Sequence, residues 1–296
     1  MTHPAYIASA RVRILRTFAT RSVEVLPDSE LWFVLEEMRL FSDGTRDHET
    51  GNTDSETDDL AVNVGLDLLR GVRIDEELGI LSGADVPHMT ETLRTLASFK
   101  HGSLQHRLQF NESEYELHMA AQFQGHGQRV SFVDTRRPSR YKQRVEFMVG
   151  YKWPIECKHP QSKRKIIPNI DAALKKLNER GQPGIICIGL EQALPMAERL
   201  YIEVIKAEDV VARVSEQVAP WFANHKMLLA NRLAQGCGRF IIFTYSAHAY
   251  VHDSEMVALP SLRLALSATG DWIQEKVIES CLKHLWHERE ETQSPD

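Results

Sequence analysis

Residues Trp153-Pro154-Ile155-Glu156-Cys157-Lys158 form the stretch of sequence that decides the fold. The segment has the length of a strand, and a glycine-containing turn precedes it, which is typical of the second strand of a hairpin. Side chains alternate across a strand, so Glu156 and Lys158 share one face while Ile155 and Cys157 share the other. We expect the apolar pair to face the core and the charged pair to line a cleft.

The segment just upstream, Val145 to Val149, is predicted to be the first strand of this hairpin, with Gly150 in the turn. If Tyr151 lies near the tip, Glu146 and Glu156 face each other across adjacent strands. Two carboxylates one strand spacing apart suit Mg²⁺, which prefers oxygen ligands and retained waters. A lysine beside them can orient water or offset charge during phosphodiester hydrolysis.

Hydrophobic periodicity extends this hairpin into an α/β fold. From residue 109 onward we expect, in chain order, a helix over 113–123, strands over 129–133, 145–149 and 153–158, a helix over 167–180, a strand over 184–189, a helix over 207–235, a strand over 240–245 and a helix over 271–290. Such an order predicts a mixed central sheet flanked by helices. We assign residues 109–296 to this domain and residues 1–108 to a mixed, mainly helical N-terminal region of unknown role.

The N-terminal region contains two segments of unusual composition. Residues 43–59 are acidic, rich in glycine and threonine and nearly devoid of apolar side chains, so we predict a mobile acidic loop. The first 23 residues carry four arginines and no acid. Such a segment is typical of a transit peptide or, as the favoured interpretation, of a basic first helix or strand.

The composition excludes several classes of protein. The chain has 296 residues, 43% of them hydrophobic and 26% charged, which is ordinary for a globular protein of one or two domains. Its four cysteines form no C-x-x-C pair, which argues against a zinc ribbon or a disulfide framework and favours the cytoplasm. No apolar run has the length of a membrane span. The motifs of P-loop, Rossmann, serine-hydrolase and zincin enzymes do not occur.

Positive charge is concentrated around the predicted strand 153–158. The chain has a net charge of -6, yet the stretch from Asp134 to Asn169 holds ten lysines and arginines and only three acids. A local basic stripe is sufficient for phosphate contacts, although a solvated loop has the same composition. The predicted nucleic-acid-binding residues are Arg136, Arg137, Arg140, Lys142, Arg144, Lys163, Arg164 and Lys165.

These residues together resemble the PD-(D/E)XK nuclease superfamily, in which a glutamate-bearing helix precedes a three-stranded meander. The stretch Tyr115 to Ala121 is similar to that helix, and Gln128 to Val133 is similar to the first strand. Val145-Glu146-Phe147 stands where the family commonly has Pro-Asp-Phe. Ile155-Glu156-Cys157-Lys158 matches the Glu-x-Lys motif, and the resemblance covers residues 109 to about 190.

The resemblance implies a restriction-endonuclease-like fold and a Mg²⁺-dependent (or Mn²⁺-dependent) nuclease acting on DNA or, as the less favoured substrate, RNA. It implies metal ligation by Glu146 and Glu156, a catalytic Lys158 and an auxiliary catalytic Glu116. Glu146 replaces the usual aspartate, and Asp134, at a strand end, is a backup ligand. By analogy of fold, such an enzyme would serve bacterial defence, mobile-element control or repair.

Several alternatives compete with this interpretation. Glu156 and Lys158 could form a surface ion pair on an edge strand. The domain could be a degenerate nuclease fold that binds nucleic acid or a protein partner without cutting, since Glu146 departs from the family pattern. The N-terminal region could be a sensor or docking domain with the nuclease as its effector. A homodimer or a regulatory protein partner is also expected.

Overall fold

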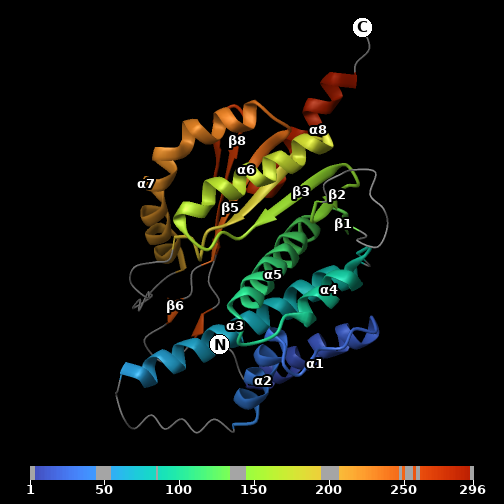
Figure 1. Ribbon diagram of the computed structural model, residues 1–296, viewed down its shortest axis with the longest axis vertical. Coiled ribbons are helices and arrows are strands. Elements are labelled where there is room, and N and C mark those ends of the chain that lie inside the picture. The colour runs from blue at the N-terminus through green and yellow to red at the C-terminus, as the bar shows by residue number, and fades with distance from the viewer. Residues whose placement is uncertain are drawn as a thin grey trace. The chain divides into compact units, whose positions relative to one another are not determined.

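The computed structural model describes residues 4–44, 55–84, 86–133, 145–194, 207–246, 249–250, 256–257 and 261–293. The chain divides into two compact units. One contains the N-terminal helices up to Ala121 together with two short strands, and the other contains a large sheet with its helices (Figure 1). The predicted boundary at residue 108 falls inside a continuous helix, α5 (Leu104–Gly125), and the division lies between Ala121 and Gln122.

The first unit is helical in the residues that the structure describes, apart from one two-stranded antiparallel ladder. Ser29 caps its second helix, where its hydroxyl accepts a hydrogen bond from the backbone N–H of Trp32 at 3.1 Å. The elements of this unit are α1 (Pro4–Thr20), α2 (Glu30–Ser42), α3 (Ser55–Gly83), α4 (Met89–Ser98), most of α5, β6 (Ala249–Tyr250) and β7 (Met256–Val257).

The predicted acidic loop is wrong in its last five residues. The third helix begins at Ser55, so residues 55–59 are helical, while residues 45–54 lie outside the described part of the chain. A low apolar content therefore did not indicate the absence of helix.

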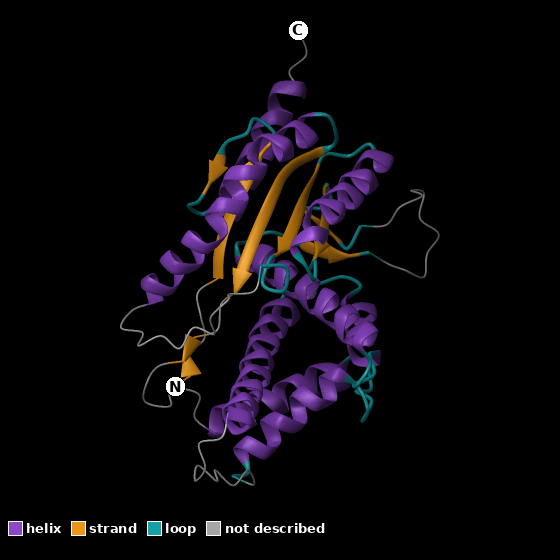
Figure 2. Cartoon of the chain, turned by 60° about the vertical axis from the view of Figure 1, so that its left-hand side comes forward, coloured by secondary structure: helices purple, strands orange, loops and turns teal. Residues whose placement is uncertain are grey.

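The second unit is an α/β domain with a seven-stranded mixed sheet (Figure 2). The strands lie in the order β1-β2-β3-β4-β5-β8-β9, in which β3, β4 and β5 run parallel and the remaining pairs are antiparallel. Its elements are β1 (Val130–Phe132), β2 (Phe147–Val149), β3 (Trp153–Lys158), α6 (Lys163–Arg180), β4 (Gly184–Gly189), α7 (Ala207–Ala234), β5 (Gly238–Ser246), β8 (Ser261–Ser267), β9 (Trp272–Ile273) and α8 (Val277–Gln293).

Strands β3 and β4 match the predicted ranges, because both are short apolar segments bounded by turns. The structure adds β8 and β9, which the sequence interpretation missed, and the last helix begins at Val277 rather than near Asp271. Helix α6 begins at Lys163, four residues before the predicted start, and it contains Pro168 near its N-terminal end.

Helices cover both faces of the sheet. The face that carries Glu156 and its register partner Ile186 is covered by α6, which contacts β3, β4 and β5. On the opposite face, Cys187 interacts with the buried Cys281 of α8. Strand β3 is therefore an interior strand of a sheet buried on both faces, and the alternative of an ion pair on an exposed edge strand is wrong.

No helix in the described residues is both long enough and apolar enough to cross a membrane.

Candidate active site

The two predicted metal ligands lie opposite each other across the β2–β3 hairpin. Phe147 pairs with Ile155 in the antiparallel register, so the next position along the ladder places Glu146 opposite Glu156. The turn between the strands contains Gly150 and Tyr151, both with positive φ angles of 58° and 59°. This tight turn fixes the register, because a slip of one residue would move every side chain to the other face.

Two lysine ammonium groups lie against this carboxylate pair. The Nζ atom of Lys158 is 3.0 Å from Oε1 of Glu146 and 3.9 Å from Oε2 of Glu156. It also donates a hydrogen bond to the carbonyl oxygen of Cys157 at 2.8 Å. The Nζ atom of Lys176 is 2.8 Å from Oε2 of Glu156 and 3.3 Å from Oε1 of Glu146. Each cation therefore bridges both acids.

The cluster is more buried than the sequence suggested. The side chain of Glu156 is 0% exposed, and those of Glu146 and Lys158 are 10% and 16% exposed. We expected Glu156 and Lys158 to line a cleft, and for Glu156 this is wrong. Helix α6 covers this face of β3, and the ammonium of Lys176 closes over the carboxylate.

Burial and mutual repulsion separate the pKa values of the two acids. Burial, followed by the negative charge of Glu146, raises the pKa of Glu156 to about 9, although Lys176 and Lys158 oppose the rise. Burial also acts to raise the pKa of Glu146, but the ammonium groups of Lys158 and Lys176 outweigh it and the pKa falls below its ordinary value. A hydrogen bond with Glu156 also lowers the pKa of Glu146, so the two carboxyl groups titrate as a pair.

Two carboxylate oxygens of the pair remain available to a cation. Oε2 of Glu146 and Oε1 of Glu156 are buried and have no hydrogen-bond partner outside the pair among the described residues. Buried carboxylate oxygens of this kind fit a hard divalent cation, because coordination would give them the partner that they lack. The pair supplies only two ligands, and the described residues contain no cluster of three or more metal-ligating side chains. Water or a substrate oxygen would have to complete the coordination of a metal.

The remaining side chains of β3 have structural positions. Ile155 and Cys157, on the opposite face from Glu156, are 0% and 3% exposed. Cys157 lies beside Cys187 in the parallel register, and all four cysteines of the chain are free. Cys157 therefore packs in the core, as its position on the apolar face predicted.

Glu116 lies on α5 in the first unit, and its auxiliary role stays a prediction. It is half-buried, and it follows by two residues a glutamate that the sequence interpretation passed over. That glutamate, Glu114, accepts hydrogen bonds from Arg70 and Arg73 of α3. Positions two apart on a helix point in roughly opposite directions. Glu114, not Glu116, therefore makes these ion pairs with α3.

The predicted nucleic-acid-binding residues fall into two groups. The first group lies outside the described residues and consists of Arg136, Arg137, Arg140, Lys142 and Arg144. The second group, Lys163, Arg164 and Lys165, forms the first turn of α6, where all three side chains are exposed and no acid is present. Positive charges at this end of a helix oppose its dipole, so the arrangement favours an anion nearby.

Sequence reasoning gave no definite role to Lys176, and it overlooked a neighbouring pair formed by His159 and Glu191. Nε2 of His159 is 3.1 Å from Oε2 of Glu191, at the carboxyl ends of the parallel strands β3 and β4. The signal for Lys176 was weak because exposed lysines are common on helices. The signal for the His–Glu pair was positional, since His159 follows directly after β3 and Glu191 lies two residues after the end of β4.

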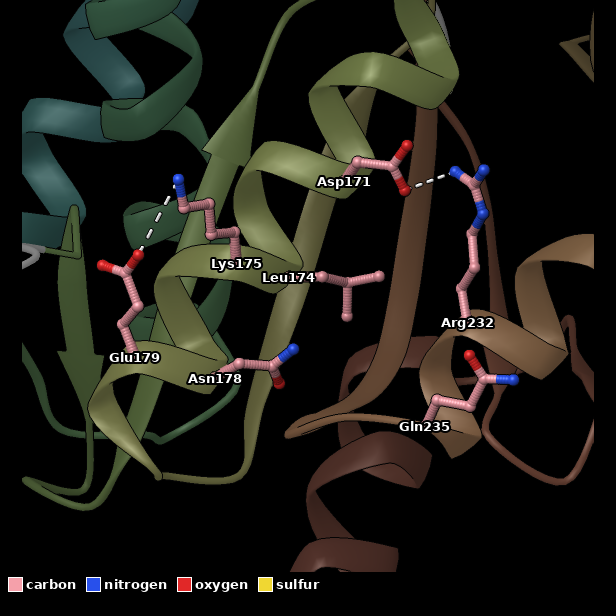
Figure 3. Close-up of a pocket in the computed structure, with 7 residues that line it drawn as sticks. All are labelled: Asp171, Leu174, Lys175, Asn178, Glu179, Arg232 and Gln235. Atoms are coloured by element: carbon pink, nitrogen blue, oxygen red, sulfur yellow. Dashed lines mark hydrogen bonds and ion pairs between the residues drawn. The ribbon is translucent and has the colours of Figure 1, made fainter.

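A shallow groove of about 530 Å³ lies between α6 and α7 (Figure 3). An ion pair between Asp171 and Arg232 joins the two helices, and Lys175 points along α6 toward Glu179. A helix turns by about 100° per residue, so the groove residue Leu174 lies on the far side of α6 from Lys176. The groove is therefore separate from the carboxylate pair.

Comparison of this chain with protein-family models, with curated proteins and with solved structures gives no match.

Proposed function

We propose that this protein is a Mg²⁺-dependent nuclease that hydrolyses phosphodiester bonds of DNA or, as the second choice, RNA, on a restriction-endonuclease-like fold. The observation that carries the proposal is the contact of Lys158 with Glu146, 3.0 Å away, and with Glu156, 3.9 Å away, across one hairpin. Carboxylates that can hold a divalent cation, with a lysine beside them, are the groups that phosphodiester hydrolysis requires.

The order and direction of the elements support this proposal. Helix α5 is followed by the antiparallel strands β1, β2 and β3, then by α6 and by β4, which runs parallel to β3. One acid lies just before the second strand of this meander and the other lies on its third strand, and the lysine lies two residues after the second acid. This agrees with the arrangement expected from the resemblance to PD-(D/E)XK nucleases.

Glu146 and Glu156 would hold the Mg²⁺, and the ion would supply positive charge to the phosphate oxygens. The ammonium of Lys158 donates hydrogen bonds and does not accept them, so it can orient the lone pair of an attacking water or offset negative charge on phosphorus. Its hydrogen bond to the Cys157 carbonyl fixes the lysine beside the acids. The exposed cations at the start of α6 would contact backbone phosphates.

A second candidate function is a nucleic-acid-binding module without catalysis. The observation in its favour is that Lys158 and Lys176 already offset the charge of the two carboxylates at 2.8–3.9 Å. Such a module would bind DNA in a salt-sensitive manner and would not cut it.

The test is a cleavage assay on plasmid, single-stranded DNA and RNA, with Mg²⁺ or Mn²⁺, on the wild-type chain and on Lys158→Ala and Glu156→Ala. The nuclease proposal expects metal-dependent cutting by the wild type and a loss of at least about 100-fold in either variant. Equal activity in all three proteins would exclude the mechanism. Salt-sensitive binding without cutting would favour the second candidate.

A further inference from the structure

Lys176 reaches the carboxylate pair from a different element than Lys158. It extends from α6, and its Nζ atom lies 2.8 Å from Glu156 and 3.3 Å from Glu146. The contact of Lys176 with Glu156 is shorter than the 3.9 Å contact of Lys158 with the same acid. The second lysine is therefore the closer cation at the more buried of the two acids.

The packing of α6 holds Lys176 in this place. Ile170, Ala173 and Leu177 are 0% exposed, and the helix contacts both β3 and β4. Gly181 ends the helix in the left-handed conformation with a φ of 64°, and its N–H donates to the carbonyl of Asn178. The backbone of Lys176 is thus fixed on the sheet. Its side chain, which is 27% exposed, can still move its ammonium toward solvent.

The charges of this cluster disfavour a further cation. Among the residues that the structure describes, at most two negative charges, those of Glu146 and Glu156, face the two positive charges of Lys158 and Lys176. A divalent cation entering this cluster would leave a buried excess of positive charge, and like charges repel strongly where the effective dielectric constant is low. An anionic group beside the cluster would remove that penalty.

We propose that the ammonium of Lys176 competes with the divalent cation for Glu146 and Glu156, so that metal binds tightly only together with a phosphodiester. This inference rests on the proposed nuclease function and adds a mode of regulation to it. The phosphodiester would attract the ammonium away from the acids and would offset the charge of the metal. Binding of metal and of nucleic acid would then be mutually cooperative, since a coupling between two ligands is reciprocal.

The first test measures the affinity for Mn²⁺ alone by calorimetry on the full chain at fixed pH. Lys176→Met removes the competing charge and is expected to tighten Mn²⁺ binding about tenfold or more. Lys176→Arg keeps the charge and should bind Mn²⁺ as the wild type does. The matched control is Lys175→Met, one residue away. The side chain of Lys175 is 75% exposed, and its ion pair is with Glu179 and not with the two acids of the site. If Lys176→Met does not fold, Lys176→Gln takes its place.

The second test repeats the titration in the presence of a DNA duplex with phosphorothioate linkages. The duplex should tighten Mn²⁺ binding about tenfold in the wild type and by less than about threefold in Lys176→Met. Equal Mn²⁺ affinity in wild type and Lys176→Met, with or without the duplex, would overturn the inference.

A Glu146→Gln variant separates the failure of this inference from the failure of the proposed nuclease function. If it binds Mn²⁺ as tightly as the wild type, there is no metal site at the pair and the proposed function fails as well. If Glu146→Gln binds Mn²⁺ more weakly while Lys176→Met binds it as the wild type does, only the competition between Lys176 and the metal is excluded.

Discussion

Glu146 lies opposite Glu156 at the position that follows the Phe147–Ile155 pair in the β2–β3 register. Glu146 lies just before the first residue of β2, and Glu156 lies within β3, so the hairpin alone brings the two acids together. Two lysines from two different elements then contact both acids. The hairpin therefore positions the carboxylate pair and Lys158, whereas the packing of α6 on the sheet positions Lys176.

The length of the side chain at position 146 should matter for cleavage. Glu146→Asp shortens the carboxylate by one methylene and withdraws it from Nζ of Lys158, which lies 3.0 Å away. We expect the single-turnover rate of plasmid cleavage to fall about 100-fold, the usual effect of a displacement of about 1 Å at a reacting centre. Glu146→Gln, which keeps the length and removes the charge, should also cut slowly. Wild-type rates in both variants would exclude Glu146 from the site.

The buried carboxyl of Glu156 should make the stability of the protein depend on pH. A carboxyl whose pKa is raised in the folded state destabilises the fold as the pH rises from its ordinary value of 4.5 toward about 9. Glu156→Gln abolishes this titration. The free energy of unfolding of this variant, relative to that of the wild type, should increase by about 4 kcal/mol between pH 5 and pH 8 in urea titrations. If the difference in unfolding free energy between the variant and the wild type stays constant from pH 5 to pH 8, the pKa of Glu156 is not raised in the folded protein.

In the first unit, Glu114 should stabilise the contact between α3 and α5. Burial acts to raise its pKa, but the charges of Arg70 and Arg73 outweigh it and lower the pKa to about 2. A lowered carboxyl pKa contributes stability above pH 4.5, and this contribution is lost as the pH falls through about 2. Glu114→Gln should therefore destabilise the unit by about 3 kcal/mol at pH 7, by removing the buried carboxylate that contacts both arginines.

Hydrogen exchange of α3 amides at pH 7 and in acid would measure this effect. The difference between Glu114→Gln and wild type should shrink as the acid protonates Glu114 in the wild type. The matched control is Glu112→Gln, an exposed position on the same helix, which should change little. Equal protection in Glu114→Gln and wild type at pH 7 would show that the ion pairs do not hold the helices together.

The first turn of α6 should contribute to nucleic-acid affinity. Replacing Lys163, Arg164 and Lys165 by glutamine removes three exposed cations from a helix start that has no acid. We expect weaker DNA binding and a smaller slope of log affinity against log salt, by about 0.9 for each phosphate that the protein no longer neutralises. Glutamine at the exposed Lys276 and Lys283 serves as the control. An unchanged salt slope would exclude this turn from the interface.

The sequence predicted the parts of the fold that depend on local pattern. Strands β3 and β4 are short apolar segments between turns, and their ranges were correct. Strand β8 was missed although Leu262, Leu264 and Leu266 alternate with smaller or polar residues, which is a readable strand signal. The start of α6 was misplaced by four residues, because the helix already begins at the charged residues Lys163, Arg164 and Lys165, which carry no apolar signal.

The candidate site could be predicted only in part. Glu146, Glu156 and Lys158 lie on one hairpin, so alternation and turn length are enough to bring them together. Lys176 is 18 residues beyond Lys158, and its contact with the acids depends on how α6 packs on the sheet. The burial of Glu156 depends on the same helix. Tertiary packing of this kind leaves no local signal, because an exposed lysine and a lysine over a carboxylate look alike in sequence.

The most direct test of the central claim is the single-turnover rate of plasmid cleavage with Mn²⁺ by four proteins: wild type, Glu156→Gln, Lys158→Met and the control Lys175→Met. The account predicts metal-dependent cleavage by the wild type and by Lys175→Met, and rates lower by at least about 100-fold in Glu156→Gln and Lys158→Met. Cleavage at the same rate by all four proteins would contradict this account. A wild-type protein that binds Mn²⁺ and DNA but does not cleave the plasmid would contradict it as well.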